Sequence, residues 1–235
     1  IMDMEQTTIS APSELDDRNL RYRDIVPPDK LAKVEVSIVG VGAIGRQVAR
    51  QLATLGCPKM KLWDHDVVEA VNLGAQGYFE ADLNKPKVVA TQSLIKAINS
   101  RIEVDPHHEL FKTRDGSVGD VLFVCVDKIS TRGRIIDNLQ PCVKLMVDGR
   151  MAAESMHILT VHDEESRIRY QETIFPQNEA YVGPCTGRTT CYTADVAAGF
   201  MVTQFTRWLR GFPLVPEFRV NLFSTLMVQE PSESH

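Results

Sequence analysis

Residues 34–45, VEVSIVGVGAIG, carry an apolar, β-branched segment directly into a G-x-G-x-x-G pattern. Its glycines are Gly40, Gly42 and Gly45. The first permits a turn with positive φ, the second lets the backbone approach a phosphate, and the third lets a helix pack closely on the strand. We expect that helix to begin near Ile44 and to present unpaired N–H groups and the positive end of its dipole to an anion. The stretch therefore predicts a binding site for a nucleotide phosphate.

The residues that follow complete a β-α-β unit. Residues 46–55 have apolar positions at helical spacing, and Gly56 is a typical helix end. A second strand, residues 60–63, leads to Asp64, close to the distance downstream at which an acidic side chain binds ribose hydroxyls. Taken alone, the glycine motif could be a glycine-rich turn that binds no ligand. The flanking strands, the helix and Asp64 favour the nucleotide site.

Two further groups of residues resemble the MoeB/ThiF family of adenylyltransferases, which includes the ubiquitin-activating enzymes. The first group is Asp64 and Asp66, Asn72-Leu73, Gln76, and Pro86-Lys87 at a helix start. The second is a strand over residues 120–126 that ends at Asp127, with Arg132 five residues later. The resemblance covers residues 21–148 well, and an ordered set of motifs is more specific than any one of them. It implies an α/β, Rossmann-like fold with a mainly parallel sheet and helices on both faces.

The resemblance also implies adenylation, in which a carboxylate oxygen attacks the α-phosphate of ATP and positive charge offsets the repulsion between two anions. It assigns Lys87 to the phosphates, Asp64 to the ribose and Asn72 to the triphosphate region. It assigns Asp127 to a Mg²⁺ ion that bridges phosphate oxygens. The alternatives are an exposed helix lysine for Lys87, a turn residue for Asn72, and a helix N-cap before residues 129–139 for Asp127.

The chain departs from the family pattern at the expected phosphate cations. Ala75 precedes Gln76 where the family has arginine, and the N-terminal signature reads Arg21-Tyr22-Arg23-Asp24. Arg23 is the candidate for the family arginine that reaches the partner subunit's ATP, and Arg46 is a candidate replacement at the phosphates. The nucleotide-binding set that the resemblance implies is Gly40, Gly42, Gly45, Arg46, Asp64, Asp66, Asn72, Gln76 and Lys87. A non-catalytic, nucleotide-binding scaffold subunit stays open as an alternative because of Ala75.

The five cysteines contain no C-x-x-C pair, so we expect no structural zinc. Their odd number without a secretory signal favours reduced thiols in the cytoplasm. Family members that form a thioester keep the nucleophile in a loop that corresponds to residues 182–191. An arginine and a helix N-terminus nearby would acidify a cysteine thiol in this loop. Cys185 is favoured over Cys191 as the nucleophile, because we expect a helix from Thr193 onward with Cys191 already packed in its first turn. An enzyme that stops at the adenylate is the alternative.

Length and composition indicate one domain, residues 21–230, between a flexible segment 1–20 and a tail 231–235. No run of eighteen apolar residues occurs, which argues against a membrane protein. The net charge of −5 does not indicate a basic surface of the kind that binds nucleic acid.

The C-terminal half predicts additions to the parallel sheet. We expect a strand over residues 142–147 with a turn at 148–150, and an antiparallel strand over 155–162. The latter is expected to pair with a strand over 167–171, which makes the sheet mixed.

A long helix over residues 193–209 has the small and apolar residues of a core or dimer interface, and residues 218–228 alternate as a last strand. The resemblance implies a homodimer.

The predicted function is ATP-dependent adenylation of the C-terminal carboxylate of a small ubiquitin-like or sulfur-carrier protein that ends in Gly-Gly, with thioester formation on Cys185 as a second step. Activation of a small-molecule or tRNA-linked carboxylate is an alternative. An NAD dehydrogenase would need a catalytic residue and a nicotinamide site that nothing in the sequence marks.

Overall fold

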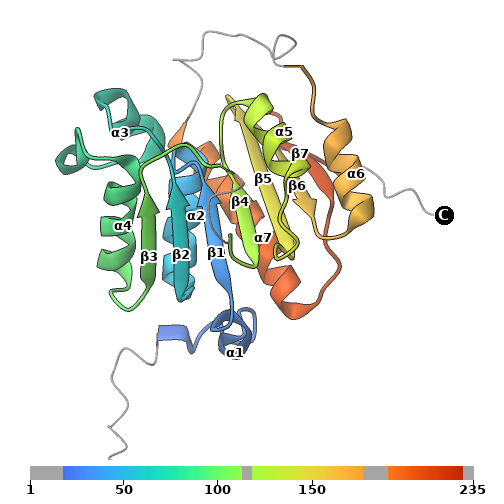
Figure 1. Cartoon of the computed structure of the whole chain (residues 1–235), viewed down its shortest axis with the longest axis horizontal. Helices are drawn as coiled ribbons and strands as arrows, with labels where there is room; N and C mark the ends of the chain where they lie inside the picture. The colour runs from blue at the N-terminus through green and yellow to red at the C-terminus, as the bar shows by residue number, and fades with distance from the viewer. Residues whose placement is uncertain (1–17, 113–117, 177–189, 230–235) are drawn as a thin grey trace, which may run out of the picture.

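The computed structural model describes residues 18–112, 118–176 and 190–229. Its strands are β1 (Glu35–Val39), β2 (Lys59–Trp63), β3 (Glu103–His107), β4 (Val121–Val124), β5 (Leu145–Ala152), β6 (Ser155–Val161), β7 (Glu217–Asn221) and β8 (Leu226–Gln229). Its helices are α1 (Pro28–Leu31), α2 (Ala43–Leu55), α3 (Ala70–Gln76), the 3₁₀ turn η2 (Glu80–Asp82), α4 (Lys87–Ile98), α5 (Ile129–Asp137), α6 (Glu164–Glu172) and α7 (Cys191–Arg210). The strands form one sheet in the order β3-β2-β1-β4-β5-β6-β7-β8 (Figure 1).

The sheet divides into a parallel and an antiparallel part. Strands β3, β2, β1, β4 and β5 run parallel, and β6, β7 and β8 each run antiparallel to the strand before them. The predicted mixed α/β sheet is therefore confirmed. The order reverses between β1 and β4, and this reversal is where open α/β sheets bind their ligands.

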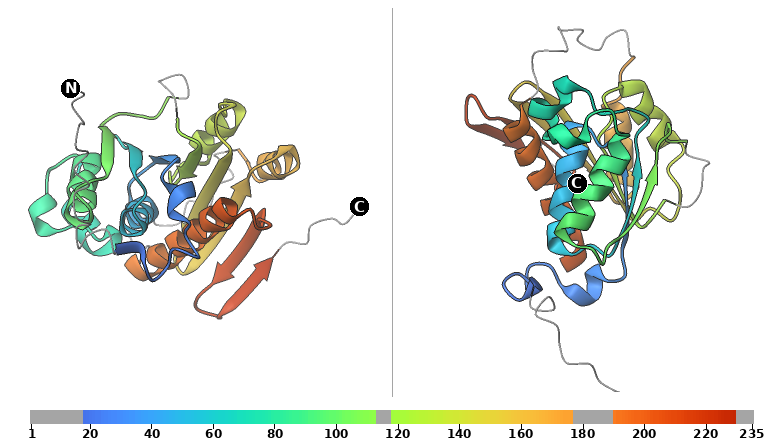
Figure 2. Two further views of the ribbon diagram at one scale, coloured as in Figure 1. Left: turned by 90° about the horizontal axis from the view of Figure 1, so that it is seen from below. Right: turned by 90° about the vertical axis from the view of Figure 1, so that its left-hand side faces the viewer.

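Helices cover both faces of the sheet (Figure 2). Helices α2, α4 and α7 lie on one face, and α5 and α6 lie on the other. Successive strand residues supply the two cores alternately, because side chains of a strand point to opposite faces. Ile38 packs in the core under α2 and α7, whereas its neighbour Val39 packs in the core under α5 and α6.

The structure corrects three predictions about the C-terminal half. Residues 167–171 lie in α6 and not in a hairpin strand, because Asp163 accepts a hydrogen bond from the Ser166 backbone N–H and caps the start of this helix. Residues 148–150 lie inside β5, paired with β6, rather than in a turn. Residues 218–228 form two strands, β7 and β8, joined by a turn in which Thr225 has a φ of 56°.

The remaining long elements agree with their predictions. Helix α2 ends at Gly56, whose φ is 84°, and α7 spans the predicted C-terminal helix. Across the described ranges, every helix is too short or too polar to cross a membrane.

Candidate nucleotide site

The carboxyl ends of three adjacent strands bring the predicted residues to one edge of the sheet. Val39 of β1 pairs with Trp63 of β2 on one side and with Val124 of β4 on the other. The loops that follow these strands carry the glycine motif, the acid pair that begins at Asp64, and Asp127. The fold therefore juxtaposes the three motifs that were separate in the sequence.

The glycine loop, residues 40–45, shows why two of its three glycines are needed by the protein itself. Gly40 has a φ of 85°, and a Cβ atom there would lie 2.8 Å from the backbone oxygen of Cys125. A Cβ atom on Gly45 would lie 1.8 Å from the backbone oxygen of Gly40. Neither position can hold a side chain.

Gly42 is different, because a Cβ atom there would meet nothing nearer than Oε1 of Gln76, at 3.7 Å. Gly42 is also the N-cap of α2, and no side chain of the described residues caps that helix end. The protein therefore leaves the backbone bare and the helix N-terminus uncapped at the place where the motif would approach a phosphate.

Asp64 and Asp66 are organised by backbone and by Lys87. Oδ2 of Asp64 accepts the N–H of Val41 at 2.9 Å, and its Oδ1 accepts the N–H of Asp66 at 2.9 Å. The Lys87 ammonium lies 2.9 Å from Oδ2 of Asp66, and the lysine side chain is only 7% exposed. Burial would raise the pKa of the Asp66 carboxyl, but Lys87, together with His65 and Lys128, holds that pKa below its usual range.

The burial of Lys87 excludes the simple alternative of an exposed helix lysine. His65 lies between the two acids, and one ligand atom from each of these three side chains falls within 4.8 Å of the others. Carboxylate oxygens and a ring nitrogen are thus gathered next to the glycine loop.

Asn72 and Gln76 lie on α3, beside the glycine loop, with different roles. Oδ1 of Asn72 accepts the backbone N–H of Glu69, so this buried amide closes the first turn of α3. Oε1 of Gln76 is buried and has no hydrogen-bond donor among the described residues. Asn72 is therefore occupied locally, whereas Oε1 of Gln76 lies near Gly42 and accepts no hydrogen bond from the described part of the chain.

Asp127 is exposed beyond the end of β4, and it does not cap α5, whose N-cap is Lys128. Its backbone oxygen accepts Nη1 of Arg132 at 3.3 Å. Nε of the same guanidinium lies 3.0 Å from Oδ1 of Asp148, which is fully buried. Arg132, five residues after Asp127, thus connects the loop after β4 to the neighbouring strand β5.

Arg46 is enclosed by protein and is only 1% exposed. Its Nε donates to the backbone oxygen of Gly77 at 3.1 Å, its Nη2 lies 3.4 Å from Asp82, and its guanidinium carbon lies 4.0 Å from the ring centre of Tyr78. This burial lowers the pKa of Arg46. The geometry does not agree with the phosphate contact expected for Arg46, and it shows a buried cluster with Tyr78 and Asp82 that no sequence motif signals.

Comparison with known proteins identifies this set of motifs. Residues 17–232 match the model of the ThiF family. The chain belongs to the ThiF family. This match extends over all three described segments and includes the loops at the carboxyl edge of the sheet.

Individual ThiF-family relatives match parts of the chain. Adenylyltransferase and sulfurtransferase MOCS3 of Anopheles gambiae is 32% identical over 125 residues, which cover 51% of this chain and 28% of that protein. Ubiquitin-like modifier-activating enzyme 5 of Caenorhabditis elegans is 27% identical over 224 residues, which cover 81% of this chain and 51% of that protein. The chain thus spans about a quarter to a half of the length of these curated relatives.

Solved structures share the fold of this ThiF-family chain. PaaA superposes with a TM-score of 0.72 at 17% identity and covers 95% of this chain and 84% of its own. E. coli MccB with ATP superposes with a TM-score of 0.64 at 19% identity, and the match covers 86% of this chain and 65% of the MccB chain. Identities this low establish the architecture alone.

The other predicted site residues of the ThiF-family chain lie away from the glycine loop or outside the described ranges. Arg23 is exposed in the segment beside the carboxyl-terminal ends of α2 and α4, at the opposite edge of the sheet (Figure 1). Cys185 lies outside the described residues. Cys191 is exposed and is the first residue of α7.

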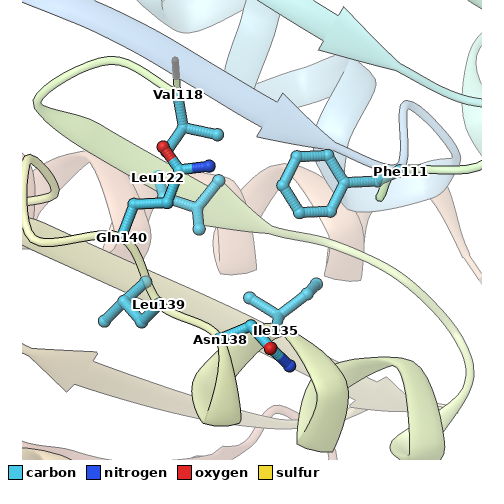
Figure 3. A pocket seen from close by; sticks show the side chains of 7 residues that line it. All are labelled: Phe111, Val118, Leu122, Ile135, Asn138, Leu139 and Gln140. Carbon is cyan, nitrogen blue, oxygen red and sulfur yellow. The ribbon is translucent and has the colours of Figure 1, made fainter. Parts of the chain in front are cut away.

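A small apolar hollow lies under α5, on the other side of the sheet from α2 (Figure 3). It is lined by Phe111, Val118, Leu122, Ile135, Asn138, Leu139 and Gln140. These side chains include no charged group that could bind a phosphate, so the hollow is separate from the candidate nucleotide site.

Proposed function

We propose that the chain binds ATP with Mg²⁺ at the glycine loop and transfers the adenylyl group to a carboxylate. The observation that carries this proposal is the contrast within the motif: a Cβ atom at Gly40 or Gly45 would clash with backbone, whereas a Cβ atom at Gly42 would clash with none of the described residues. A ligand that approaches the backbone explains Gly42, and the uncapped start of α2 favours an anionic one.

The residues present fit such a ligand. Each oxygen of Asp64 accepts one backbone N–H and keeps a lone pair that can accept a ribose hydroxyl. Lys87 would bind the phosphates by turning its ammonium from Asp66. The Gln76 amide can present Nε2 in place of Oε1 by a 180° rotation, which would give the phosphate a donor. Asp127 would hold Mg²⁺, which neutralises phosphate charge when bound.

For the substrate, we propose the C-terminal carboxylate of a small ubiquitin-like or sulfur-carrier protein that ends in Gly-Gly. The similarity to MOCS3 and to ubiquitin-like modifier-activating enzyme 5 supports a protein carboxylate. Attack of the carboxylate on the α-phosphate would form the acyl adenylate and release pyrophosphate. In a second step the deprotonated Cys185 sulfur would attack the acyl carbon, forming a thioester and releasing AMP.

The proposal includes a homodimer in which Arg23 reaches the partner subunit's nucleotide. The reason is charge. Two cations near the glycine loop were predicted to bind the phosphates, and each is paired with a carboxylate: Lys87 with Asp66, and Arg46 with Asp82. Ala75 stands where the family has a further arginine and supplies no charge. A further cation from a second copy would offset the triphosphate charge.

A scaffold subunit without catalysis is the second candidate, and Ala75 is the observation that favours it. ATP–pyrophosphate exchange distinguishes the two candidates. We expect exchange that depends on a Gly-Gly carrier and is abolished by Lys87→Ala and Asp127→Asn. Asp120→Asn is the matched control, because Asp120 precedes the strand that Asp127 follows and pairs with exposed Lys144 at the opposite edge. ATP binding without exchange for any carrier would favour the scaffold, and no ATP binding would refute both.

A further inference from the structure

Tyr78 is buried beneath the glycine loop and donates its hydroxyl hydrogen to the backbone oxygen of Val41, at 2.6 Å. The other groups near this hydroxyl are more distant: the Lys87 backbone oxygen at 3.5 Å and Oγ1 of Thr91 at 3.3 Å. Burial raises the pKa of Tyr78, so the hydroxyl keeps its proton. A phenol has one proton to donate, and the short contact assigns it to Val41.

The Val41 residue is consequently fixed at both of its polar atoms. Its N–H donates to Asp64 at 2.9 Å, and its oxygen accepts from Tyr78. The peptide that joins Val41 to Gly42 is trans, and in a planar trans peptide the C=O and the next N–H point in opposite directions. With the Val41 oxygen directed at Tyr78, the N–H of Gly42 points away from the buried layer.

The ring of Tyr78 is in turn held in place by Arg46. The guanidinium stacks over the ring at 4.0 Å, and it is anchored to Gly77 and Asp82 on either side of Tyr78 in the sequence. The buried cation that the sequence suggested for the phosphates thus contacts the tyrosine that donates to the loop.

We propose that Tyr78 is a positioning residue of the anion site, whose hydroxyl orients the Val41–Gly42 peptide so that the Gly42 N–H is presented to a nucleotide phosphate. This inference rests on the proposed function, since it takes ATP as the anion. Tyr78 touches no phosphate; it acts through the peptide. The same bond explains why a bare backbone at Gly42 has a defined direction.

The test compares Tyr78→Phe with Thr91→Val. The first removes only the hydroxyl that holds Val41 and keeps the ring under Arg46. The second removes a hydroxyl from the same buried cluster, 3.3 Å from that of Tyr78, and leaves the bond to Val41 in place. Two readouts are measured in the intact chain: amide hydrogen exchange of residues 40–46 without ligand, and the Kd for ATP with Mg²⁺.

For Tyr78→Phe we expect faster exchange in residues 40–46 and an ATP Kd raised about five- to tenfold, the effect of losing one buried hydrogen bond. Thr91→Val should show near-native values for both, although both variants lose some thermal stability. Native exchange and a native Kd in Tyr78→Phe would overturn the inference, as would equal effects of the two variants. If the native chain binds no ATP, the proposed function is refuted. Faster exchange of residues 40–46 in Tyr78→Phe than in the native chain would then still support Tyr78 as the residue that orders the loop.

Discussion

Two buried arginine clusters support the candidate nucleotide site from opposite faces of the sheet. The α2 cluster consists of Arg46, Tyr78 and Asp82, and it holds the glycine loop through the Tyr78 hydroxyl. The β5 cluster consists of Arg132, Asp148, Arg150 and Tyr170, and it holds the loop after β4 through the Asp127 backbone oxygen. Both combine arginine, tyrosine and aspartate, but they neutralise the buried charge differently.

The β5 cluster concentrates two cations on one carboxylate. Asp148 is fully buried and accepts Nε of Arg132 at 3.0 Å, Nε of Arg150 at 2.7 Å and the Tyr170 hydroxyl at 3.0 Å. Burial would raise the pKa of Asp148, but the two guanidiniums outweigh it and hold that pKa below its usual range. One carboxylate thus balances two arginines, and its removal leaves both without a counter-charge.

The α2 cluster distributes its charge more widely. Arg46 has a 3.4 Å contact with Asp82 and also uses the Tyr78 ring and the Gly77 backbone oxygen. Asp82 also accepts the backbone N–H of Phe79 at 3.1 Å. Each of these partners keeps a further contact when the other is removed. The arginines of the β5 cluster also keep hydrogen bonds without Asp148, to the Gly149 backbone oxygen and to Thr173, so the difference lies in the shared counter-charge. Clusters built from the same residue types can therefore neutralise buried arginine charge with one shared carboxylate or with several weaker contacts.

The largest effect is expected for Asp148→Ala, because buried Arg132 and half-buried Arg150 lose their shared counter-charge. We expect a loss of about 3–5 kcal/mol in the free energy of unfolding, the range for removal of one partner from a buried ion pair. Urea denaturation measures it. A loss below about 1 kcal/mol would show that the β5 cluster is not centred on this carboxylate.

A smaller loss is expected for Arg46→Met, which keeps the length of the side chain and removes its charge. Asp82 retains the Phe79 N–H, so we expect a decrease of about 1–3 kcal/mol in the free energy of unfolding. The same denaturation experiment measures it. An effect as large as that of Asp148→Ala would remove the distinction between the clusters.

The fold was predictable from sequence where local patterns and tertiary structure agree. The strand–glycine–helix segment and the acid at Asp64 lie within one β-α-β unit, so spacing alone located them. Residues 167–171 were wrongly predicted as a strand paired with residues 155–162, because the helix cap at Asp163 was read as part of a turn.

The candidate site was predictable only in part. Lys87 and Asp127 follow motifs, whereas Tyr78 and Asp82 approach Arg46 only after α3 and α4 have packed on α2. The burial of Arg46 also leaves no mark in the local sequence pattern, because Asp82, the carboxylate that pairs with it, lies 36 residues away in the chain. Sequence spacing therefore indicated the candidate residues in the loops but not the buried layer beneath them.

The acid dependence of stability tests the charge of Asp148 directly. Its folded pKa lies below the unfolded value of roughly 3.9, so its contribution is complete above that value and is lost as pH falls toward the folded pKa. We expect the native chain to lose up to about 1.4 kcal/mol more per pH unit than Asp148→Asn in this window. Urea denaturation between pH 5 and pH 3, which brackets roughly 3.9, measures the two slopes, and equal slopes would contradict the prediction.

The smallest effect is expected for Asp195→Ala, which breaks an exposed arginine–aspartate pair between α2 and α7. Arg50 and Asp195 have side chains that are 42% and 43% exposed, so water solvates either partner after the other is removed. Arg50 also keeps a 2.9 Å hydrogen bond to Gln47. We expect a loss of about 0–1 kcal/mol in the free energy of unfolding, measured by the same urea titration. This pair joins one arginine to one aspartate, as the α2 cluster does, but it is exposed where the α2 pair is buried. A loss near that of Asp148→Ala would therefore mean that burial is not what separates the clusters from the surface.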